Sequence, residues 1–256
     1  GLSGGECPDV WNLKFPDRVE NVGRAYVEAG SQVILTNTFR SNRLSLGDYG
    51  QEEYTSEINR KGVRLSKKAA GDRVKVFASM GPTGKLLITG EITEELLKKV
   101  FEEQAISLAE GEPDAIIVET MSDLTEAKIA LQAAQETGLP AGVSMVYDSG
   151  VKKDCTMMGV TVEQATAELT AAGADFVGAN CGRGIEDFAG ICRRMRDNTH
   201  LPLWIKPNAG LPEYVDGKTI YRTTPADFSI KVPALIEAGA TFIGGCGGTT
   251  PEFIRE

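Results

Sequence analysis

The feature that most constrains the fold of this chain is a repeated alternation of short apolar runs with amphipathic helical stretches. Several runs are nearly apolar throughout, which is typical of strands buried on both faces of a parallel sheet. Glycine closely follows several helical stretches, where a left-handed C-cap favours it. The expected strands are Gln32–Phe39, Lys75–Pro82, Ala115–Thr120, Ala141–Tyr147, Asp175–Cys181, Pro202–Asn208 and Thr241–Cys246. The expected helices include Asp17–Ala29, Thr93–Glu110, Ser122–Thr137, Thr161–Ala172 and Ala226–Ala238, with C-cap glycines at Gly30, Gly111, Gly138, Gly173 and Gly239.

Seven βα units follow from this pattern, whereas a (β/α)8 barrel needs eight. The predicted fold class is therefore α/β, a (β/α)8 TIM-type barrel that lacks its first strand and most of its last helix, which Thr250-Pro251 opens. An open doubly wound sheet is the alternative, but no Gly-x-Gly-x-x-Gly turn follows an early strand. Residues 1–256 contain no linker, so we predict a single domain that is a fragment of a longer chain. The long loop Pro207–Thr224 carries a turn signal at Asp216-Gly217 and predicts a small hairpin over the barrel mouth.

Charge and composition exclude several classes of function. The net charge of −9 argues against a nucleic-acid surface, which needs clustered Lys and Arg. No apolar run approaches the roughly 20 residues of a membrane helix, and Gly1–Gly5 does not begin a signal peptide. The five cysteines are odd in number and widely spread, which indicates reduced thiols and a cytoplasmic location, with metal or catalytic work open to some of them.

Polar and sulfur-containing residues gather where the predicted strands end. In a barrel the carboxyl ends of the strands form the active-site face. Cys181 and Cys246 each close a strand and are followed by glycine, so their thiols are expected to converge. A pair of convergent thiols favours a metal site, with zinc as the default ion, although small buried core cysteines are an equally simple interpretation. The strand-end residues are Asn37, Thr38, Glu119, Asn180, Cys181, Asn208 and Cys246.

The chain resembles the homocysteine S-methyltransferases, which include the homocysteine-binding barrel of cobalamin-dependent methionine synthase and betaine–homocysteine methyltransferase. The resemblance runs in order from Cys7–Asn12 to the C-terminus, and the motifs are specific only when taken together. The segments that carry it are Ile34–Phe39, Gly81–Gly84, Val118–Thr120, Gly178–Gly182, Pro207–Gly210 and Ile243–Cys246 with Thr249–Pro251.

The resemblance implies a zinc-bound homocysteine thiolate that attacks an activated methyl group. Cys181 and Cys246 match metal-ligand positions, and Asn208 matches a position that can offer its side-chain oxygen to zinc before substrate binds. Glu119 matches a position that pairs with the amino group of the substrate, although a structural partnership with Lys or Arg is the alternative. Asn37 and Thr38, with Phe39 beside them, either bind the substrate or tie down the loop before Arg40. The family's first strand, with its glycine-rich substrate loop, has no counterpart here.

One position departs from the family pattern. The family reads Gly-Gly-Cys-Cys-Gly after the last strand, whereas this chain reads Gly244–Gly248 with Gly247 in place of the third thiolate. Three interpretations follow: zinc binds with another ligand, the protein uses a different methyl acceptor without zinc, or the chain is inactive. Cys7 and Cys155 are candidate substitutes. The two residues judged unsuited to this role are Cys192, in mid-helix, and His200, at the amino end of a strand.

The function predicted from the sequence is transfer of a methyl group to a zinc-activated thiol, with homocysteine as acceptor and methionine as product. The donor is not readable from the sequence; methyl-cobalamin on another domain or protein, a sulfonium compound and betaine are the options. Two alternatives remain: a corrinoid-linked methyltransferase with a non-thiol substrate, and a non-catalytic barrel that binds an amino acid or scaffolds a corrinoid partner.

Overall fold

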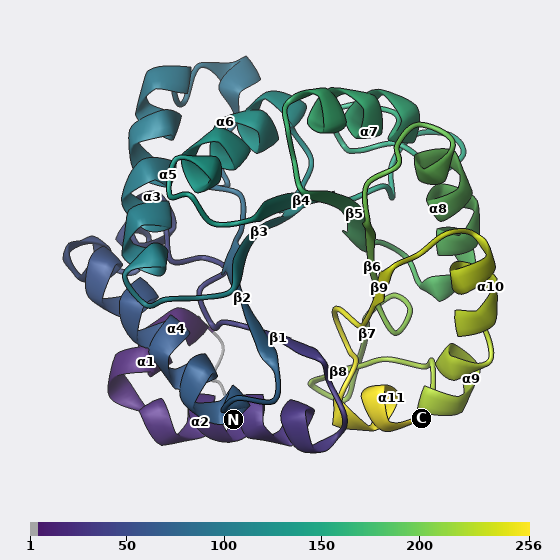
Figure 1. The fold of residues 1–256 in the computed structure, drawn as a ribbon, viewed down its shortest axis with the longest axis horizontal. Coiled ribbons are helices and arrows are strands. Elements are labelled where there is room, and N and C mark those ends of the chain that lie inside the picture. The colour runs from purple at the N-terminus through teal and green to yellow at the C-terminus, as the bar shows by residue number, and fades with distance from the viewer. Residues whose placement is uncertain (1–4) are drawn as a thin grey trace. The chain divides into compact units, whose positions relative to one another are not determined.

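The computed structural model describes residues 5–256, which form two compact units. The first runs to Glu119 and includes Thr125–Ala141; the second comprises Thr120–Leu124 and Gly142–Glu256. Each unit is built from parallel strands joined by helices, and in Figure 1 the helices of each unit lie on one face of its strands.

In the first unit the strands pair in chain order, β1-β2-β3. Val33 aligns with Lys75 across β1 and β2, and Phe77 aligns with Ala115 across β2 and β3. A buried cluster of residues that includes Val27, Ile34, Ala69 and Val76 joins α2 and α4 to β1 and β2. The strands are β1 (Val33–Leu35), β2 (Lys75–Met80) and β3 (Ala115–Met121); the helices are α1 (Trp11–Lys14), α2 (Pro16–Glu28), α3 (Arg43–Gly47), α4 (Thr55–Ala70), α5 (Glu94–Ala109) and α6 (Leu124–Gln135).

In the second unit the parallel strands pair as β4-β5-β6-β9. Three aromatic rings, of Phe176, Trp204 and Phe242, pack with centroids 5.3–6.0 Å apart. Glycine makes room for them, because a Cβ at Gly142 would lie 2.3 Å from the Phe176 ring. The strands are β4 (Ala141–Met145), β5 (Phe176–Cys181), β6 (Leu203–Pro207) and β9 (Phe242–Ile243); the helices are α7 (Val162–Ala171), α8 (Phe188–Arg196), α9 (Pro225–Ser229), α10 (Val232–Glu237) and α11 (Pro251–Arg255).

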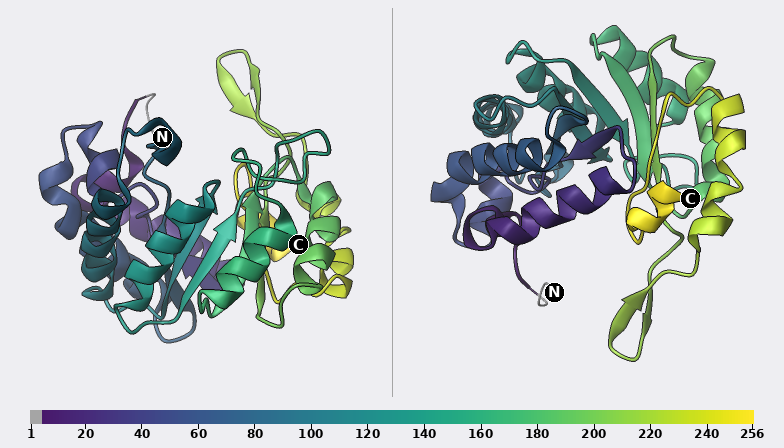
Figure 2. Two further views of the ribbon diagram at one scale, coloured as in Figure 1. Left: turned by 90° about the horizontal axis from the view of Figure 1, so that it is seen from above. Right: turned by 60° about the horizontal axis from the view of Figure 1, so that its bottom comes forward.

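The predicted hairpin is present between β6 and α9. Strands β7 (Glu213–Val215) and β8 (Lys218–Ile220) pair antiparallel, and Figure 2 shows them projecting from the rest of the second unit. Asp216 and Gly217 between them have φ angles of +49° and +76°. Positive φ at both central residues suits the twist of a two-residue hairpin, which explains the Asp-Gly signal.

The seven expected parallel strands all occur within residues 5–256, and their order within each unit never reverses. The doubly wound alternative, which requires a reversal, is therefore wrong. Two strands, β1 and β9, are much shorter than expected. β1 ends at Leu35 because the hydroxyls of Thr36 and Thr38 bond to the backbone of Ser79 in place of a regular ladder. β9 ends at Ile243, before the glycine-rich segment.

Two helix expectations need correction. The expected helix Ala226–Ala238 is split into α9 and α10, because Pro233 has no N–H to donate and opens the first turn of α10. After α5 it is Glu112, at φ +63°, that takes the left-handed conformation in place of Gly111. Gly111 serves close packing instead, since a Cβ there would lie 2.5 Å from Val63. Thr93 and Thr161, at which two of the expected helices begin, are the N-caps of α5 and α7, and the side chain of each accepts a hydrogen bond from a first-turn N–H.

No helix within residues 5–256 combines the length and the apolar character of a membrane span. Of the segment Gly1–Gly5, on which the absence of a signal peptide was predicted, residues 1–4 lie outside the described part of the chain.

Candidate active site

The strand ends of the first unit carry a network of hydroxyl groups that leads to Glu119. The hydroxyl oxygens of Thr36 and Thr38 lie 2.5 Å apart, and Thr38 donates to the Ser79 carbonyl at 2.7 Å. The Ser79 hydroxyl in turn donates to Glu119 Oε1 at 2.6 Å. Glu119 is only 6% exposed. The partner that its burial led us to expect therefore includes a neutral hydroxyl.

Asn37 and Phe39 are engaged with other parts of the first unit. The Asn37 side chain donates to the Pro8 carbonyl at 2.8 Å and to Asn12 Oδ1 at 3.0 Å, which ties the end of β1 to the helical segment near the N-terminus. The Phe39 ring lies against Gly81, where a Cβ would come within 2.4 Å of it. These contacts match the loop-tying interpretation for Asn37, and a role of either residue in substrate binding stays a prediction.

In the second unit the thiols of Cys181 and Cys246 are close neighbours. Cys181 is the last residue of β5; Cys246 follows the end of β9, and its N–H donates to the Pro207 carbonyl at 2.9 Å. The proximity of the Cys246 thiol, together with burial, raises the pKa of Cys181 above its ordinary value. Without a metal, Cys181 is therefore a protonated thiol at neutral pH. The strand-end argument expected this convergence, whereas the role of the two thiols as ligands stays a prediction.

The backbone is strained at one member of this pair, Cys181, and at Thr120. Cys181 and Thr120 have φ angles of +67° and +65°, a region that residues other than glycine rarely adopt. Asn180 stabilises the arrangement, because its Oδ1 accepts from the Thr120 N–H at 2.9 Å and its Nδ2 donates to Thr120 Oγ1 at 2.8 Å. The same Nδ2 lies 3.7 Å from the Cys246 sulfur, and Ser144 also donates to Asn180 Oδ1 at 2.7 Å. A buried amide thus links the strained strand ends to the thiols.

Asn208 lies directly beside Cys181. Its Nδ2 donates to the Gly182 carbonyl at 2.8 Å and to the Cys181 sulfur at 3.5 Å, and its Oδ1 accepts from the Gly247 N–H at 2.7 Å. In this orientation the amide nitrogen faces the sulfur and supports a thiolate there. The position predicted for Asn208 beside the thiols is observed, and its use as a metal ligand stays a prediction.

The other cysteines and the histidine lie in different settings. Cys192 is buried within α8, where its thiol contacts the Ala238 carbonyl at 3.4 Å, so its structural assignment agrees with its place. Cys155 donates to the Ser149 carbonyl at 3.2 Å, and Cys7, in the first unit, contacts Asp9. His200 is exposed ahead of β6. Within residues 5–256 no three side chains of His, Cys, Asp or Glu gather as a metal cluster.

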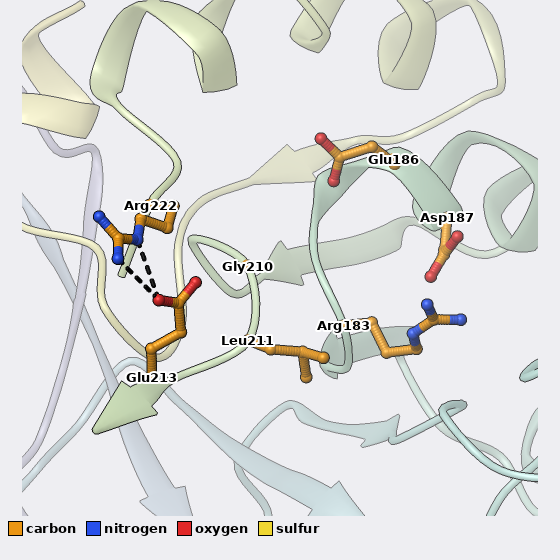
Figure 3. Close-up of a pocket in the computed structure, with 7 residues that line it drawn as sticks. All are labelled: Arg183, Glu186, Asp187, Gly210, Leu211, Glu213 and Arg222. Carbon is orange, nitrogen blue, oxygen red and sulfur yellow. Dashed lines mark hydrogen bonds and ion pairs between the residues drawn. The ribbon is translucent and has the colours of Figure 1, made fainter. Parts of the chain in front are cut away.

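A charged cavity of about 290 Å³ lies in the second unit (Figure 3). Arg183, two residues after Cys181, lines it and forms no ion pair with a described residue. Arg222 on the opposite wall donates to Glu213 at 2.9 Å. The complete lining is Arg183, Glu186, Asp187, Gly210, Leu211, Glu213 and Arg222. Both Gly210 and Arg183 follow site residues closely in sequence, so the recess belongs to the same strand ends as the thiols.

The pair of thiols fits zinc by chemistry. Zinc prefers thiolate sulfur at about 2.3 Å in tetrahedral geometry, which places two sulfurs about 3.8 Å apart. Cys181 and Cys246 are neighbouring thiols, as such a site requires. The two thiols supply half of a tetrahedral set, and the remaining positions fall to oxygen donors or to a substrate.

Sequence reasoning missed three contributors to this site: Thr120, Ser144 and Tyr221. Thr120 and Ser144 are bonded to Asn180 as described, and Tyr221 lies against the glycine pair Gly247-Gly248. Thr120 lies in the motif Val118–Thr120 but was given no role there, and for Ser144 no sequence signal exists. For Tyr221 the signal is the glycine pair itself, because adjacent glycines after a strand indicate a close approach by another group.

Comparison with known proteins agrees with this architecture. Residues 3–256 match the family model described as homocysteine S-methyltransferase. The chain is 30% identical over 266 residues to methionine synthase of Mycobacterium leprae and 31% identical to that of Mycobacterium tuberculosis. Each match covers all of this chain and 22% of the relative, so the chain spans about a fifth of the length of these proteins.

Among solved structures, the metallated form of the homocysteine methyltransferase MmuM from Escherichia coli superposes with a TM-score of 0.82. The match has 21% identity and covers 100% of this chain and 89% of that one. The oxidised form gives a TM-score of 0.80 at 22% identity. At this identity the likeness shows the fold, and the predicted barrel class is confirmed. The motifs, the strand-end architecture and the match over residues 3–256 agree, and the chain belongs to the homocysteine S-methyltransferase family.

Proposed function

We propose that this chain transfers a methyl group to the sulfur of homocysteine and yields methionine. The observation that carries the proposal is the proximity of the Cys181 and Cys246 thiols, with Asn208 and Asn180 beside them, at the strand ends of the second unit. In the reaction a carbon–sulfur bond forms, the bond between the methyl group and its donor breaks, and the thiol proton leaves to solvent. Membership of the family supports this reaction class.

The residues proposed to hold zinc are Cys181 and Cys246, with Asn208 beside them. When bound, zinc lowers the pKa of the homocysteine thiol and keeps a nucleophile available at neutral pH. Asn180 orients the Cys246 sulfur through its Nδ2 at 3.7 Å. Asn208 Nδ2, at 3.5 Å from the Cys181 sulfur, stabilises negative charge there. Orientation of donor and acceptor supplies the rest of the rate enhancement.

Glu119, Asn37, Thr38 and Phe39 are the proposed substrate-binding residues of the first unit. A carboxylate that is 6% exposed at a strand end is suited to an ammonium group, because the attraction is strong where water is excluded. The Ser79 hydroxyl holds Oε1 of Glu119 at 2.6 Å and fixes the direction of the carboxylate. The matching amino group is that of an amino-acid thiol.

The proposed methyl donor is methyl-cobalamin carried by another domain or protein. The support is length: the methionine synthase relatives extend far beyond the region that this chain covers. We also propose a cytoplasmic location, where five cysteines, none in a disulfide, stay reduced. The corrinoid-linked enzyme with a non-thiol substrate is the second candidate, which Gly247 at the third thiolate position favours.

The test measures zinc content and methionine formation by the full chain with homocysteine. Methyl-cobalamin, S-methylmethionine, S-adenosylmethionine and betaine are offered as donors in separate reactions. We expect zinc at one equivalent, methionine from at least one donor, and loss of both with Cys181→Ser. Cys155→Ser is the matched control, because it removes another partly buried thiol of the second unit. Methionine formation that is unaffected by Cys181→Ser, or absent with all donors, contradicts the proposal.

A further inference from the structure

The glycine pair Gly247-Gly248 is covered by a tyrosine. A Cβ built on Gly248 would lie 2.2 Å from Cγ of Tyr221 and within 2.6 Å of both Cδ atoms. The ring therefore lies directly on this residue, which also has a φ of +80°. Any side chain at position 248 would displace the ring. Gly248 thus serves the placement of Tyr221 as well as the turn.

The hydroxyl of Tyr221 reaches toward the neighbouring glycine. A Cβ built on Gly247 would lie 3.2 Å from the Tyr221 hydroxyl oxygen and 2.9 Å from Asn208 Oδ1. Gly247 is outside the left-handed region, so its φ angle does not require glycine, but a side chain there requires the Asn208 amide to shift. Two oxygen atoms therefore border the space that the cysteine side chain of the family pattern would enter.

These two oxygens differ in the hydrogen bonds that they already form. Asn208 Oδ1 already accepts from the Gly247 N–H at 2.7 Å, and the amide nitrogen of Asn208 is turned toward the Cys181 sulfur. The Tyr221 hydroxyl, on a half-buried side chain, forms no hydrogen bond with another described residue. Of the two, the Tyr221 oxygen is the one that accepts no hydrogen bond from a described residue, whereas Asn208 Oδ1 has one of its two lone pairs engaged.

We propose that the Tyr221 hydroxyl oxygen is the third protein donor to zinc, beside the Cys181 and Cys246 sulfurs. The inference rests on the proposed function, because it requires the zinc site. Zinc accepts oxygen ligands at about 2.0–2.2 Å, and four-coordinate catalytic sites pair three protein ligands with one open position. Two sulfurs and one oxygen leave that position for the substrate thiol. The Tyr221 oxygen would then take the place of the third thiolate that Gly247 lacks.

The chain offers a matched pair of tyrosines for the test. Tyr221→Phe removes only the oxygen and keeps the ring on Gly248. Tyr214→Phe, on the exposed hairpin with a side chain 79% exposed, is the control. Zinc affinity of the full chain is measured by competition with a chromogenic chelator under reducing conditions, and cobalt(II) substitution reports the ligand set through its absorption bands. Gly247→Cys is made alone and together with Tyr221→Phe.

We expect Tyr221→Phe to weaken zinc binding about 10-fold or more, because loss of a direct ligand exceeds the usual effect of losing a supporting partner. It should also change the cobalt spectrum, and Tyr214→Phe should change neither. Gly247→Cys should restore the affinity of Tyr221→Phe and add thiolate-to-cobalt absorption. Equal melting temperatures of the metal-free proteins verify that the variants fold.

Two results overturn the inference, and they are distinguishable. If native protein and Tyr221→Phe bind zinc equally well with identical cobalt spectra, while Cys181→Ser does not bind, then Tyr221 is not a ligand and the proposed zinc site stands. If native protein binds no zinc, the zinc-dependent function fails and the inference fails with it.

Discussion

The strand ends of the first unit and those of the second differ in what their polar groups contact. Around Glu119 the oxygen–oxygen hydrogen bonds are 2.5–2.7 Å long: the Thr36 and Thr38 hydroxyls bond to each other, Thr38 donates to the Ser79 carbonyl, and the Ser79 hydroxyl donates to Glu119. Around Cys181 and Cys246, amide nitrogens meet sulfur at 3.5–3.7 Å. The first arrangement is tight and complete, whereas sulfur contacts of this length are weak and readily exchanged for a metal.

This difference suggests that the strand ends of the first unit stabilise the fold, whereas those of the second unit bind the metal. Short bonds between buried hydroxyls make a rigid wall, because each group that loses its partner leaves another one unsatisfied. The amide contacts that hold the thiols are long and weak, so they orient the sulfurs but stabilise the fold little. Substitutions in the first unit should therefore affect stability most, and substitutions at the thiols should affect metal binding most. Three variants test this division, in order of expected effect.

The largest effect is expected for Cys246→Ser. It removes one of two sulfur donors, so zinc affinity should fall by at least about 100-fold. The melting temperature of the metal-free protein should hardly change, because the lost contact to Asn180 is long. The measurements are a zinc titration and a thermal melt in chelator. A large loss of stability in the metal-free protein, together with unchanged zinc binding, would show that Cys246 stabilises the fold and does not bind the metal.

Thr38→Val should lower stability and leave zinc affinity unchanged, which is the opposite of the effect expected for Cys246→Ser. Valine keeps the shape of the side chain but leaves the Ser79 carbonyl and the Thr36 hydroxyl without their partner. We expect a loss of about 3 kcal/mol in the free energy of unfolding, measured by urea denaturation, with zinc affinity unchanged. Thr89→Val, at an exposed hydroxyl, is the control. A stability equal to that of native protein would show that the network is dispensable.

Asp114→Asn probes the amino end of the same strands in the first unit. Burial raises the pKa of Asp114, but the N–H of Val76 and the ammonium groups of Lys75 and Lys67 outweigh it and lower that pKa to about 2. Because the folded-state pKa lies below the ordinary 3.8, the stabilisation is fully present above pH 4 and is lost as pH falls toward 2.

At pH 7 the Asn variant should be less stable by about 1–2 kcal/mol, and this difference should vanish near pH 2. Urea denaturation at several pH values is the measurement, with zinc affinity followed at neutral pH. A difference that persists unchanged at low pH would mean that Asp114 acts through packing and not through its charge.

The fold was largely predictable because hydrophobic periodicity reports burial directly. Strands such as Lys75–Met80 are apolar on both faces, and the Asp216-Gly217 turn fixes its hairpin locally. The end of β1 was not predictable, since Thr36 and Thr38 satisfy the backbone of another strand by side-chain bonds. The break between α9 and α10 is readable in principle from Pro233, which interrupts an otherwise helical pattern.

The site was predictable where a residue type, such as cysteine, itself indicates metal binding or catalysis. Cysteines at strand ends stand out, and their convergence follows from parallel pairing. Tyr221 could not be found in this way, because its approach to Gly247 depends on how the segment after the hairpin returns to the strand ends. Thr120 and Ser144 act through Asn180, and contacts between residues so far apart in sequence leave no local pattern.

The left-handed backbone at Thr120 and Cys181 has a consequence for how this sequence tolerates change. Because the Asn180 amide bonds to Thr120 and adjoins Cys181, the three positions share one arrangement and their substitutions should be epistatic. Asn180 replacements remove support from Thr120, after which a glycine at 120 becomes advantageous where it had been neutral. Substitutions at these positions should therefore be tolerated more readily in one order than in another. A double-mutant cycle between positions 120 and 180 would measure the coupling energy on which this order depends.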